Sequence, residues 1–174
     1  ILENSNVPVG TVPIYQVAIE AKRKYNDITK ISKAHIFETI EKHCQDGVDF
    51  ITVHCGVTEE VLKKLSSFKR TAGIVSRGGA ILACWINKNK KENPLYEDFE
   101  TLLKIVKKYN VVLSLGDGLR PGSISDATDI AQISELFILG ELVERARKEN
   151  VQVMVEGPGH VPLNQIEVNV KLQK

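Results

Sequence analysis

The fold is decided by the stretch VVLSLGDGLRPG, residues 111–122, in which an apolar segment runs directly into a polar turn that contains three glycines. The segment 111–115 is nearly all apolar, which is typical of a strand buried on both faces in a parallel sheet. The turn then carries a carboxylate, Asp117, and a guanidinium, Arg120. The stretch therefore predicts a strand of a parallel sheet with a candidate functional loop at its carboxyl end.

The same order of strand, polar loop and helix occurs along the whole chain. Short β-type runs predict further strands at 11–14, 49–54, 72–76 and 151–155. Helical periodicity predicts helices at about 17–25, 32–47, 59–67, 95–109 and 126–148, and the last residues, 167–174, also look helical. Thr58 and Asn93 stand where helix N-caps are expected. The pattern predicts a parallel sheet covered by helices.

Two architectures fit repeated βα units, namely a (β/α) barrel of the TIM type and an open doubly wound sheet. Polar segments with glycine follow nearly every predicted strand, at 54–56, 76–79, 116–122 and 156–160. In a barrel all such loops converge on one face, whereas an open sheet brings together only those at its switch point. We therefore expect an α/β fold in which residues 1–174 form about five consecutive βα units of one incomplete barrel domain. Both ends of the sequence look cut.

Composition excludes several classes of protein. The chain has 174 residues, 43% of them apolar, with 23 basic against 22 acidic residues and a net charge of +1. It therefore lacks the signatures of a disordered chain and of a nucleic-acid-binding arm. No run approaches the ~20 apolar residues of a membrane span, and the start ILENSNVPVG does not resemble a signal peptide. We expect a cytoplasmic protein of one domain.

Two loops carry candidate binding groups near the middle of the chain. His54 ends a predicted strand, so its imidazole is expected to point into the barrel mouth as a hydrogen-bond partner, an acid or base, or a metal ligand. The alternative is a buried histidine that a backbone carbonyl satisfies. Ser76, Arg77, Gly78 and Gly79 precede a helix start and predict an anion site, because backbone N–H groups and a guanidinium both favour phosphate or carboxylate. A plain glycine turn is the alternative there.

Two further loops carry charged groups. Asp117 and Arg120 lie on one turn, where they form either an internal salt bridge or a donor–acceptor pair for a ligand. Glu156 and His160 bound the segment EGPGH, and a histidine on a loop after a barrel strand is a reasonable zinc ligand. A capped turn is the alternative. One histidine cannot make a zinc site, so the other ligands must come from elsewhere.

The remaining cysteines and histidines predict structural roles. Cys44 falls on the buried face of a predicted helix and Cys84 in an apolar run, so both are expected in the core. Cys55 could lie near the barrel mouth. The three spacings exclude an iron–sulfur cluster built from these residues alone. His35 and His43 lie on a helix away from the loops, where we expect solvated structural histidines.

Four motifs, NSNVPVGTVPIYQ, GIVSRGG, LGDGLRPG and VEGPGHVPL, occur in this order. With them the chain, from Asn4 to about Asn169, resembles the phosphomethylpyrimidine synthase family of thiamine biosynthesis. The resemblance implies a (β/α) barrel core that uses S-adenosylmethionine with a 4Fe-4S cluster to generate an adenosyl radical. It further implies that 5-aminoimidazole ribonucleotide is converted into 4-amino-5-hydroxymethyl-2-methylpyrimidine phosphate, with carbon monoxide and formate as by-products.

The resemblance also implies site residues, wherever this sequence matches the family's motifs. The implied substrate contacts are Tyr15, His54, Ser76, Arg77, Gly78, Asp117, Gly118, Leu119, Arg120 and Glu156. His160 is the implied zinc ligand, with the other histidine ligand outside this chain, and no catalytic residue is implied here. The implied partners are the small ribonucleotide and, in the full enzyme, a second copy in a homodimer, but neither nucleic acid nor a membrane.

This sequence departs from the family pattern in three respects. The family's cysteine motif for the cluster, its second zinc-binding histidine and an upstream substrate-contacting segment have no match here. We therefore expect a core fragment that cannot catalyse the reaction by itself. Two alternatives stay open: a barrel fragment that only binds a phosphorylated metabolite, and a metal-dependent hydrolase in which His54 and His160 share one metal.

Overall fold

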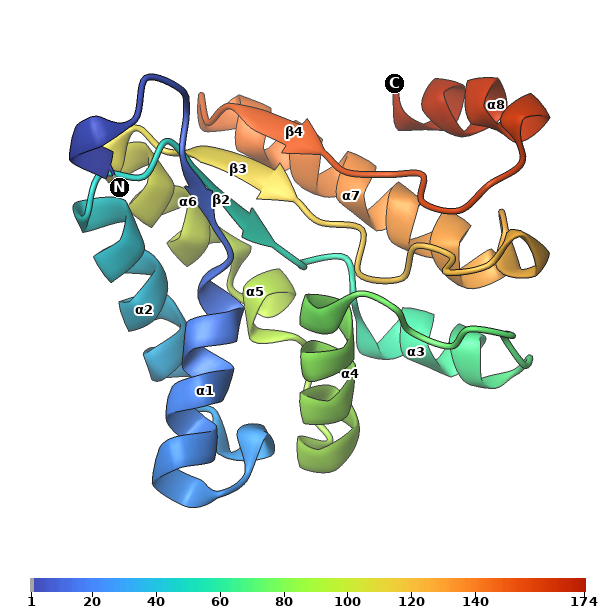
Figure 1. Ribbon diagram of the computed structural model, residues 1–174, viewed down its shortest axis with the longest axis horizontal. Helices are drawn as coiled ribbons and strands as arrows, with labels where there is room; N and C mark the ends of the chain where they lie inside the picture. The colour runs from blue at the N-terminus through green and yellow to red at the C-terminus, as the bar shows by residue number, and fades with distance from the viewer. Residues whose placement is uncertain (1) are drawn as a thin grey trace.

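A computed structural model of the chain describes residues 2–174. Its centre is a parallel sheet with strand order β1-β2-β3-β4 (Figure 1). The strands are β1 (Gly10–Thr11), β2 (Phe50–Val53), β3 (Val112–Leu115) and β4 (Val153–Val155). All neighbouring pairs are parallel, with Ile51 opposite Leu113 and Leu113 opposite Val153. The four carboxyl ends therefore meet at one edge of the sheet.

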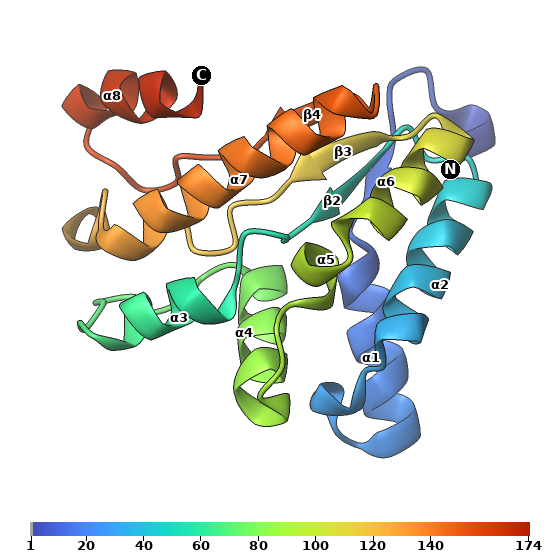
Figure 2. The same cartoon turned by 180° about the vertical axis from the view of Figure 1, so that it is seen from behind.

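Helices alternate with these strands and cover the sheet. They are α1 (Pro13–Tyr25), α2 (Lys33–Gln45), α3 (Glu59–Ser66), α4 (Arg77–Asn89), α5 (Pro94–Glu97), α6 (Phe99–Tyr109), α7 (Ile130–Lys148) and α8 (Leu163–Gln173). Short 3-10 turns are η1 (Leu2–Asn4), η2 (Ile28–Lys30) and η3 (Ile124–Asp126). Figure 2 shows α2, α6 and α7 side by side over one face of the sheet. This face carries the core, with Phe99 and Leu102 of α6 fully buried.

The predicted alternation of parallel strands with helices is confirmed. Both predicted N-caps are also confirmed, since Thr58 Oγ1 accepts from the Val61 amide at 3.3 Å and Asn93 Oδ1 from the Leu95 amide at 3.0 Å. The strand order has no reversal within residues 2–174. A section of a (β/α) barrel has this sequential order, whereas an open doubly wound sheet reverses at its switch point.

The predicted strand 72–76 is wrong, so the described residues contain four strands and not five. The segment is a loop, and the apolar run 80–85 after it belongs to α4. The reason is that the amides of Thr71 and Ala72 donate to the carboxylate of Asp126, at 2.7 and 2.9 Å, and not to a neighbouring strand. Gly73 also takes a positive φ of 63°, which ends any extended run.

Other element boundaries differ from the sequence prediction. The first strand stops at Thr11 because Pro13 has no amide hydrogen and a φ suited to the first turn of a helix, so α1 begins there. The predicted helix 95–109 is divided at Asp98 into α5 and α6. The helix predicted from 126 begins at Ile130, where the side chain of Asp129 caps it by accepting from the Gln132 amide.

The cysteines are placed partly as predicted. Cys44 and Cys55 are buried, but Cys84 is exposed, so its assignment to the core was wrong. The apolar run around Cys84 is a helix, and its buried side holds Leu82 and Ile86 while Cys84 faces outward. None of the helices in residues 2–174 combines the length and the apolar character that crossing a membrane requires.

Asn93 fixes the loop that follows β2. Its side chain is 0% exposed, and its Nδ2 donates to the carbonyl oxygens of both His54 and Val57, each at 2.9 Å. Its Oδ1 also caps α5. One amide side chain therefore satisfies two buried carbonyl groups and ties the loop to the next helix.

We expect Asn93→Ala to lower the free energy of unfolding by about 3 kcal/mol, because a buried group left without its hydrogen bond costs ~1–3 kcal/mol. Chemical denaturation of the wild type and the variant measures the change. Asn87→Ala, at an exposed position of α4, is the matched control and should change stability by less than about 0.5 kcal/mol. Equal losses for the two variants would contradict this role of Asn93.

Candidate active site

His54 lies immediately after β2, in the centre of the strand ends. Its side chain is buried, with 3% of the residue exposed. A Cβ atom placed on Gly78 would lie 2.2 Å from His54 Cε1, and one on Gly116 would lie 3.0 Å from His54 Cδ2. The imidazole therefore fits between two loops only because both contact it through glycine.

The protonation of His54 follows from this enclosure. Burial, with a smaller contribution from the positive charge of Arg120, lowers the pKa of His54 to about 4. The ring is accordingly neutral near pH 7. Among the described residues, Nδ1 of this ring has no hydrogen-bond partner. His54 therefore presents a neutral imidazole with one nitrogen that a ligand could satisfy.

The segment Ser76–Gly79 forms the start of α4. Ser76 Oγ caps this helix by accepting from the Gly79 amide at 3.1 Å. The guanidinium of Arg77 stacks on the ring of Tyr15 at 4.8 Å from its centroid, which joins α4 to the first turn of α1. A helix start with an adjacent guanidinium attracts anions.

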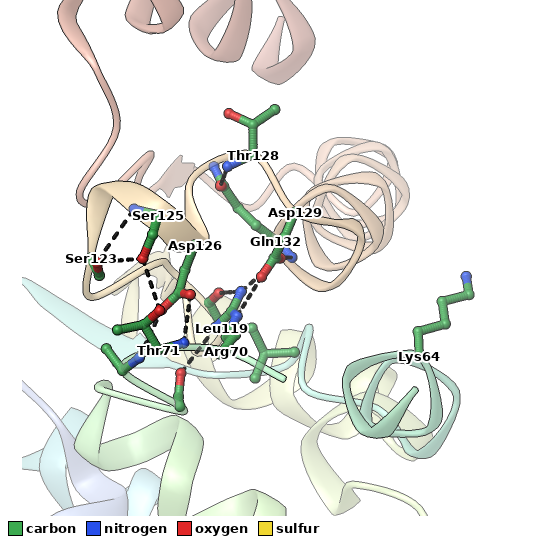
Figure 3. A network of polar contacts seen from close by, with 12 residues as sticks. Lys64, Arg70, Thr71, Leu119, Ser123, Ser125, Asp126, Thr128, Asp129 and Gln132 are labelled. Carbon is green, nitrogen blue, oxygen red and sulfur yellow. Dashed lines mark hydrogen bonds and ion pairs between the residues drawn. The ribbon is translucent and has the colours of Figure 1, made fainter. Parts of the chain in front are cut away.

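A buried ion pair holds the segment that leads into α4, residues 70–76, against the loop after β3. Arg70 Nη2 donates to Asp129 Oδ1 at 2.8 Å and to the Leu119 carbonyl oxygen at 2.7 Å (Figure 3). Asp126 accepts the amides of Thr71 and Ala72, and these hydrogen bonds hold the pKa of Asp126 below its usual value. The 70–76 segment and the 119–129 segment are therefore fixed to each other by side chains.

The loops after β3 and β4 also contact each other. Asp117 Oδ1 pairs with Arg120 Nη1 at 2.8 Å. Burial raises the pKa of Asp117, against the opposing effect of Arg120, and the nearby Glu156 raises it too. Ser114 Oγ donates to Glu156 Oε1 at 3.3 Å, and a Cβ on Gly159 would lie 2.9 Å from the Cβ of Arg120. These contacts bring three charged side chains to one place.

Leu119 and His160, two of the residues implied by the motifs, are opposite in exposure. Leu119 is fully buried, and both its amide and its carbonyl group are bonded within the protein, to Glu135 and Arg70. His160 is exposed, and its Nδ1 lies 3.2 Å from the Pro121 carbonyl oxygen, which leaves the other ring nitrogen on the exposed side. The remaining members lie in one continuous set of contacts: Tyr15, His54, Ser76, Arg77, Gly78, Asp117, Gly118, Arg120 and Glu156.

Sequence reasoning missed Glu135, which lies on α7 beneath these loops. Its side chain is buried, its Oε2 accepts from the Leu119 amide at 2.7 Å, and burial raises its pKa to about 8. A sequence signal existed, because Glu135 falls on the same helical face as Ala131, Leu139 and Leu142. A glutamate on a buried face needs a specific partner.

The metal-binding residues are sparse in the part of the chain that is described. Residues 2–174 hold no group of three histidine, cysteine, aspartate or glutamate side chains that could bind a metal ion.

The expected solvated histidines on α2 are instead hydrogen-bonded: His35 to Glu20 at 2.6 Å and His43 to Thr11 and Gln16, each at 2.8 Å. Both keep a structural role.

Known proteins are similar in sequence to the whole of this chain. The chain is 65% identical to the phosphomethylpyrimidine synthase of Thermoanaerobacter sp. (strain X514), 61% to that of Carboxydothermus hydrogenoformans and 58% to that of Moorella thermoacetica, over all 174 residues in each case. It spans only about 40% of the length of these relatives. The Radical SAM ThiC family matches residues 1–174. Because the match covers the whole sequence, the chain belongs to the Radical SAM ThiC family.

Proposed function

We propose that this chain is the substrate-binding core of a phosphomethylpyrimidine synthase, which converts 5-aminoimidazole ribonucleotide into 4-amino-5-hydroxymethyl-2-methylpyrimidine phosphate. The observation that carries the proposal is the convergence of loops at the strand ends. The 76–79 and 116–122 loops contact His54, and the 156–160 loop contacts the 116–122 loop. A relative of that name is 65% identical to this chain over all 174 residues. The sequential parallel strands support residues 1–174 as part of one (β/α) barrel domain.

Each group at the strand ends fits a part of a small ribonucleotide. The start of α4, with Arg77, suits the phosphate, because free amides and a guanidinium both bind oxyanions. Neutral His54 and the paired Asp117 and Arg120 suit the ribose hydroxyls and the polar imidazole ring. Glu156, beside Asp117 and Arg120, adds a hydrogen-bond acceptor. Tyr15 orients Arg77. In this proposal Gly78 and Gly118 give the ligand room, and Leu119 acts by shaping the loop.

The cofactors of this family supply the radical chemistry. S-adenosylmethionine with a 4Fe-4S cluster would provide an adenosyl radical when bound. The cysteines described here do not fit such a cluster, since Cys44 and Cys55 are buried, and burial raises the pKa of both thiols, while Cys84 lies alone on α4. We assign the cluster ligands to residues outside this chain, and the activity to the full enzyme, which we propose is a homodimer.

His160 fits a zinc site as a single ligand. Donation from its Nδ1 to the Pro121 carbonyl oxygen leaves Nε2 for a metal, which is the usual arrangement of a zinc-binding histidine. The second histidine is assigned outside this chain. A shared metal between His54 and His160, as a hydrolase would need, is disfavoured because residues 2–174 hold no group of three side chains that could bind a metal ion.

Binding of 5-aminoimidazole ribonucleotide to the full-length enzyme should slow amide hydrogen exchange in residues 77–79, 117–120 and 156, because these loops line the proposed site. Inorganic phosphate alone should protect only 77–79. Amides 36–44 of α2 serve as the internal control and should not change. Mass spectrometry of exchanged peptides measures the effect, and protection confined to α2 would contradict the site.

Arg77→Lys and Arg120→Lys should each weaken binding of the ribonucleotide by about 1–3 kcal/mol, because an ammonium cannot replace the planar fork of a guanidinium. Titration calorimetry with the full-length protein measures the affinity. Arg147→Lys is the control, since Arg147 makes an exposed pair with Glu144 on α7. Arginines that act only as structural salt bridges would leave the affinity unchanged.

The lowered pKa of His54 predicts a pH-dependent loss of stability. As the pH falls from 6.5 to about 4, the unfolded chain takes up the proton first, so the folded state loses stability. The difference between a pKa of 6.5 in the unfolded chain and about 4 in the folded chain corresponds to about 3 kcal/mol of stability. All of this stability is present above pH 6.5. We expect His54→Gln to remove that amount from the pH dependence of the unfolding free energy. If the unfolding free energy of the variant and that of the wild type depend on pH in the same way, His54 is not buried in neutral form.

A further inference from the structure

Glu135 lies on α7 with its carboxyl group enclosed between the loops that follow β2 and β3. Only 2% of the residue is exposed. A Cβ on Gly56 would lie 2.7 Å from Glu135 Cγ, and one on Gly118 would lie 3.1 Å from Glu135 Oε1. Both loops therefore approach this carboxyl group as closely as residues without side chains allow.

The carboxyl group fixes the main chain between Asp117 and Arg120. Glu135 Oε2 accepts from the Leu119 amide at 2.7 Å, and the Leu119 carbonyl oxygen accepts from Arg70 at 2.7 Å. The peptide units on both sides of Leu119 are thus held by buried charged or polar side chains. The directions in which Asp117 and Arg120 leave the loop depend on these two peptide units.

From this geometry we infer that Glu135 is a positioning residue, which holds the 117–120 loop in the conformation that presents Asp117 and Arg120 to the ribonucleotide. The inference rests on the proposed function, because it concerns binding of that ligand. It adds a residue that does not itself touch the ligand and that lies outside the four motifs of the sequence. The length of the Glu135 side chain fixes the position of the loop, because its hydrogen bond to the Leu119 amide joins α7 to the loop after β3.

The second oxygen of Glu135 supports a role for the neutral acid. Oε1 has no hydrogen-bond partner among residues 2–174. Glu135 also lines a cavity of about 20 Å³ with Asp117, Arg120 and Glu156, which is room for one water. The pKa near 8 keeps the group largely protonated at neutral pH, so Oε1 can carry the proton while Oε2 still accepts from Leu119. A glutamine reproduces both functions.

The test compares variants of different length and polarity at position 135 in the full-length protein. Glu135→Gln keeps the acceptor at the same reach, Glu135→Asp keeps the acid but shortens it, and Glu135→Met keeps the volume but loses the acceptor. Leu142→Met, in the core of α7 away from the loop, is the control for a general effect on stability. Exchange of the Leu119 amide, the dissociation constant of 5-aminoimidazole ribonucleotide and the melting temperature are measured for each.

We expect Glu135→Met and Glu135→Asp to speed Leu119 exchange at least tenfold and to weaken binding at least fivefold. Glu135→Gln and Leu142→Met should stay within twofold of the wild type in both. The inference is overturned if the aspartate variant, which keeps the acid but shortens it, binds like the wild type, or if affinity merely follows the melting temperature across the set. If the wild type itself binds no ribonucleotide, the proposed function fails, and Leu119 exchange alone decides whether Glu135 anchors the loop.

Discussion

The buried guanidinium of Arg70 is the interaction on which the arrangement of the site depends. Its side chain is 1% exposed, and it donates to Asp129, to the Leu119 carbonyl oxygen and to the Gly73 carbonyl oxygen. A buried cation is stable only when its hydrogen bonds are satisfied, and removing one partner of such a pair costs about 3–5 kcal/mol. Arg70 therefore holds three segments in fixed relation: the cap of α7, the loop after β3 and the segment leading into α4.

Fixing these segments matters because the loops pack on one another through main chain. A Cβ on Gly79 would lie 2.2 Å from the Gly118 carbonyl oxygen, so the two loops touch without side chains between them. Polar side chains from different strands can then surround His54 within a small volume. The geometry follows the general rule that parallel α/β sheets bind ligands at the carboxyl ends of their strands.

The sequence predicted the alternation of parallel strands with helices better than it predicted the segment 72–76. Apolar runs such as 111–115 and the caps at Thr58 and Asn93 are local signals, and each was confirmed. The run 72–76 has the composition of a strand, but the partner of its first amides is Asp126, more than fifty residues away along the chain. The role of Glu135 also depends on a contact with another element, because its carboxyl group accepts from the Leu119 amide of the loop that packs against α7. The sequence of the helix alone does not show this contact. The motifs grouped the remaining site residues without giving their distances.

The way in which α8 is attached has a consequence for how the molecule opens. Within the described residues its one buried residue is Asn169, whose amide joins Gln132, Thr128 and Gln165 in a chain of hydrogen bonds, while Leu163, Val168 and Leu172 face outward. These hydrogen bonds fix the orientation of α8 but contribute little free energy to its attachment. Water can replace each of them, and separation of α8 exposes little apolar surface. We therefore expect α8, together with the 156–162 loop that leads into it, to behave as a cooperative unit that unfolds before the sheet does. The segment that carries Glu156 and His160 would then be able to move while the loops around His54 stay rigid.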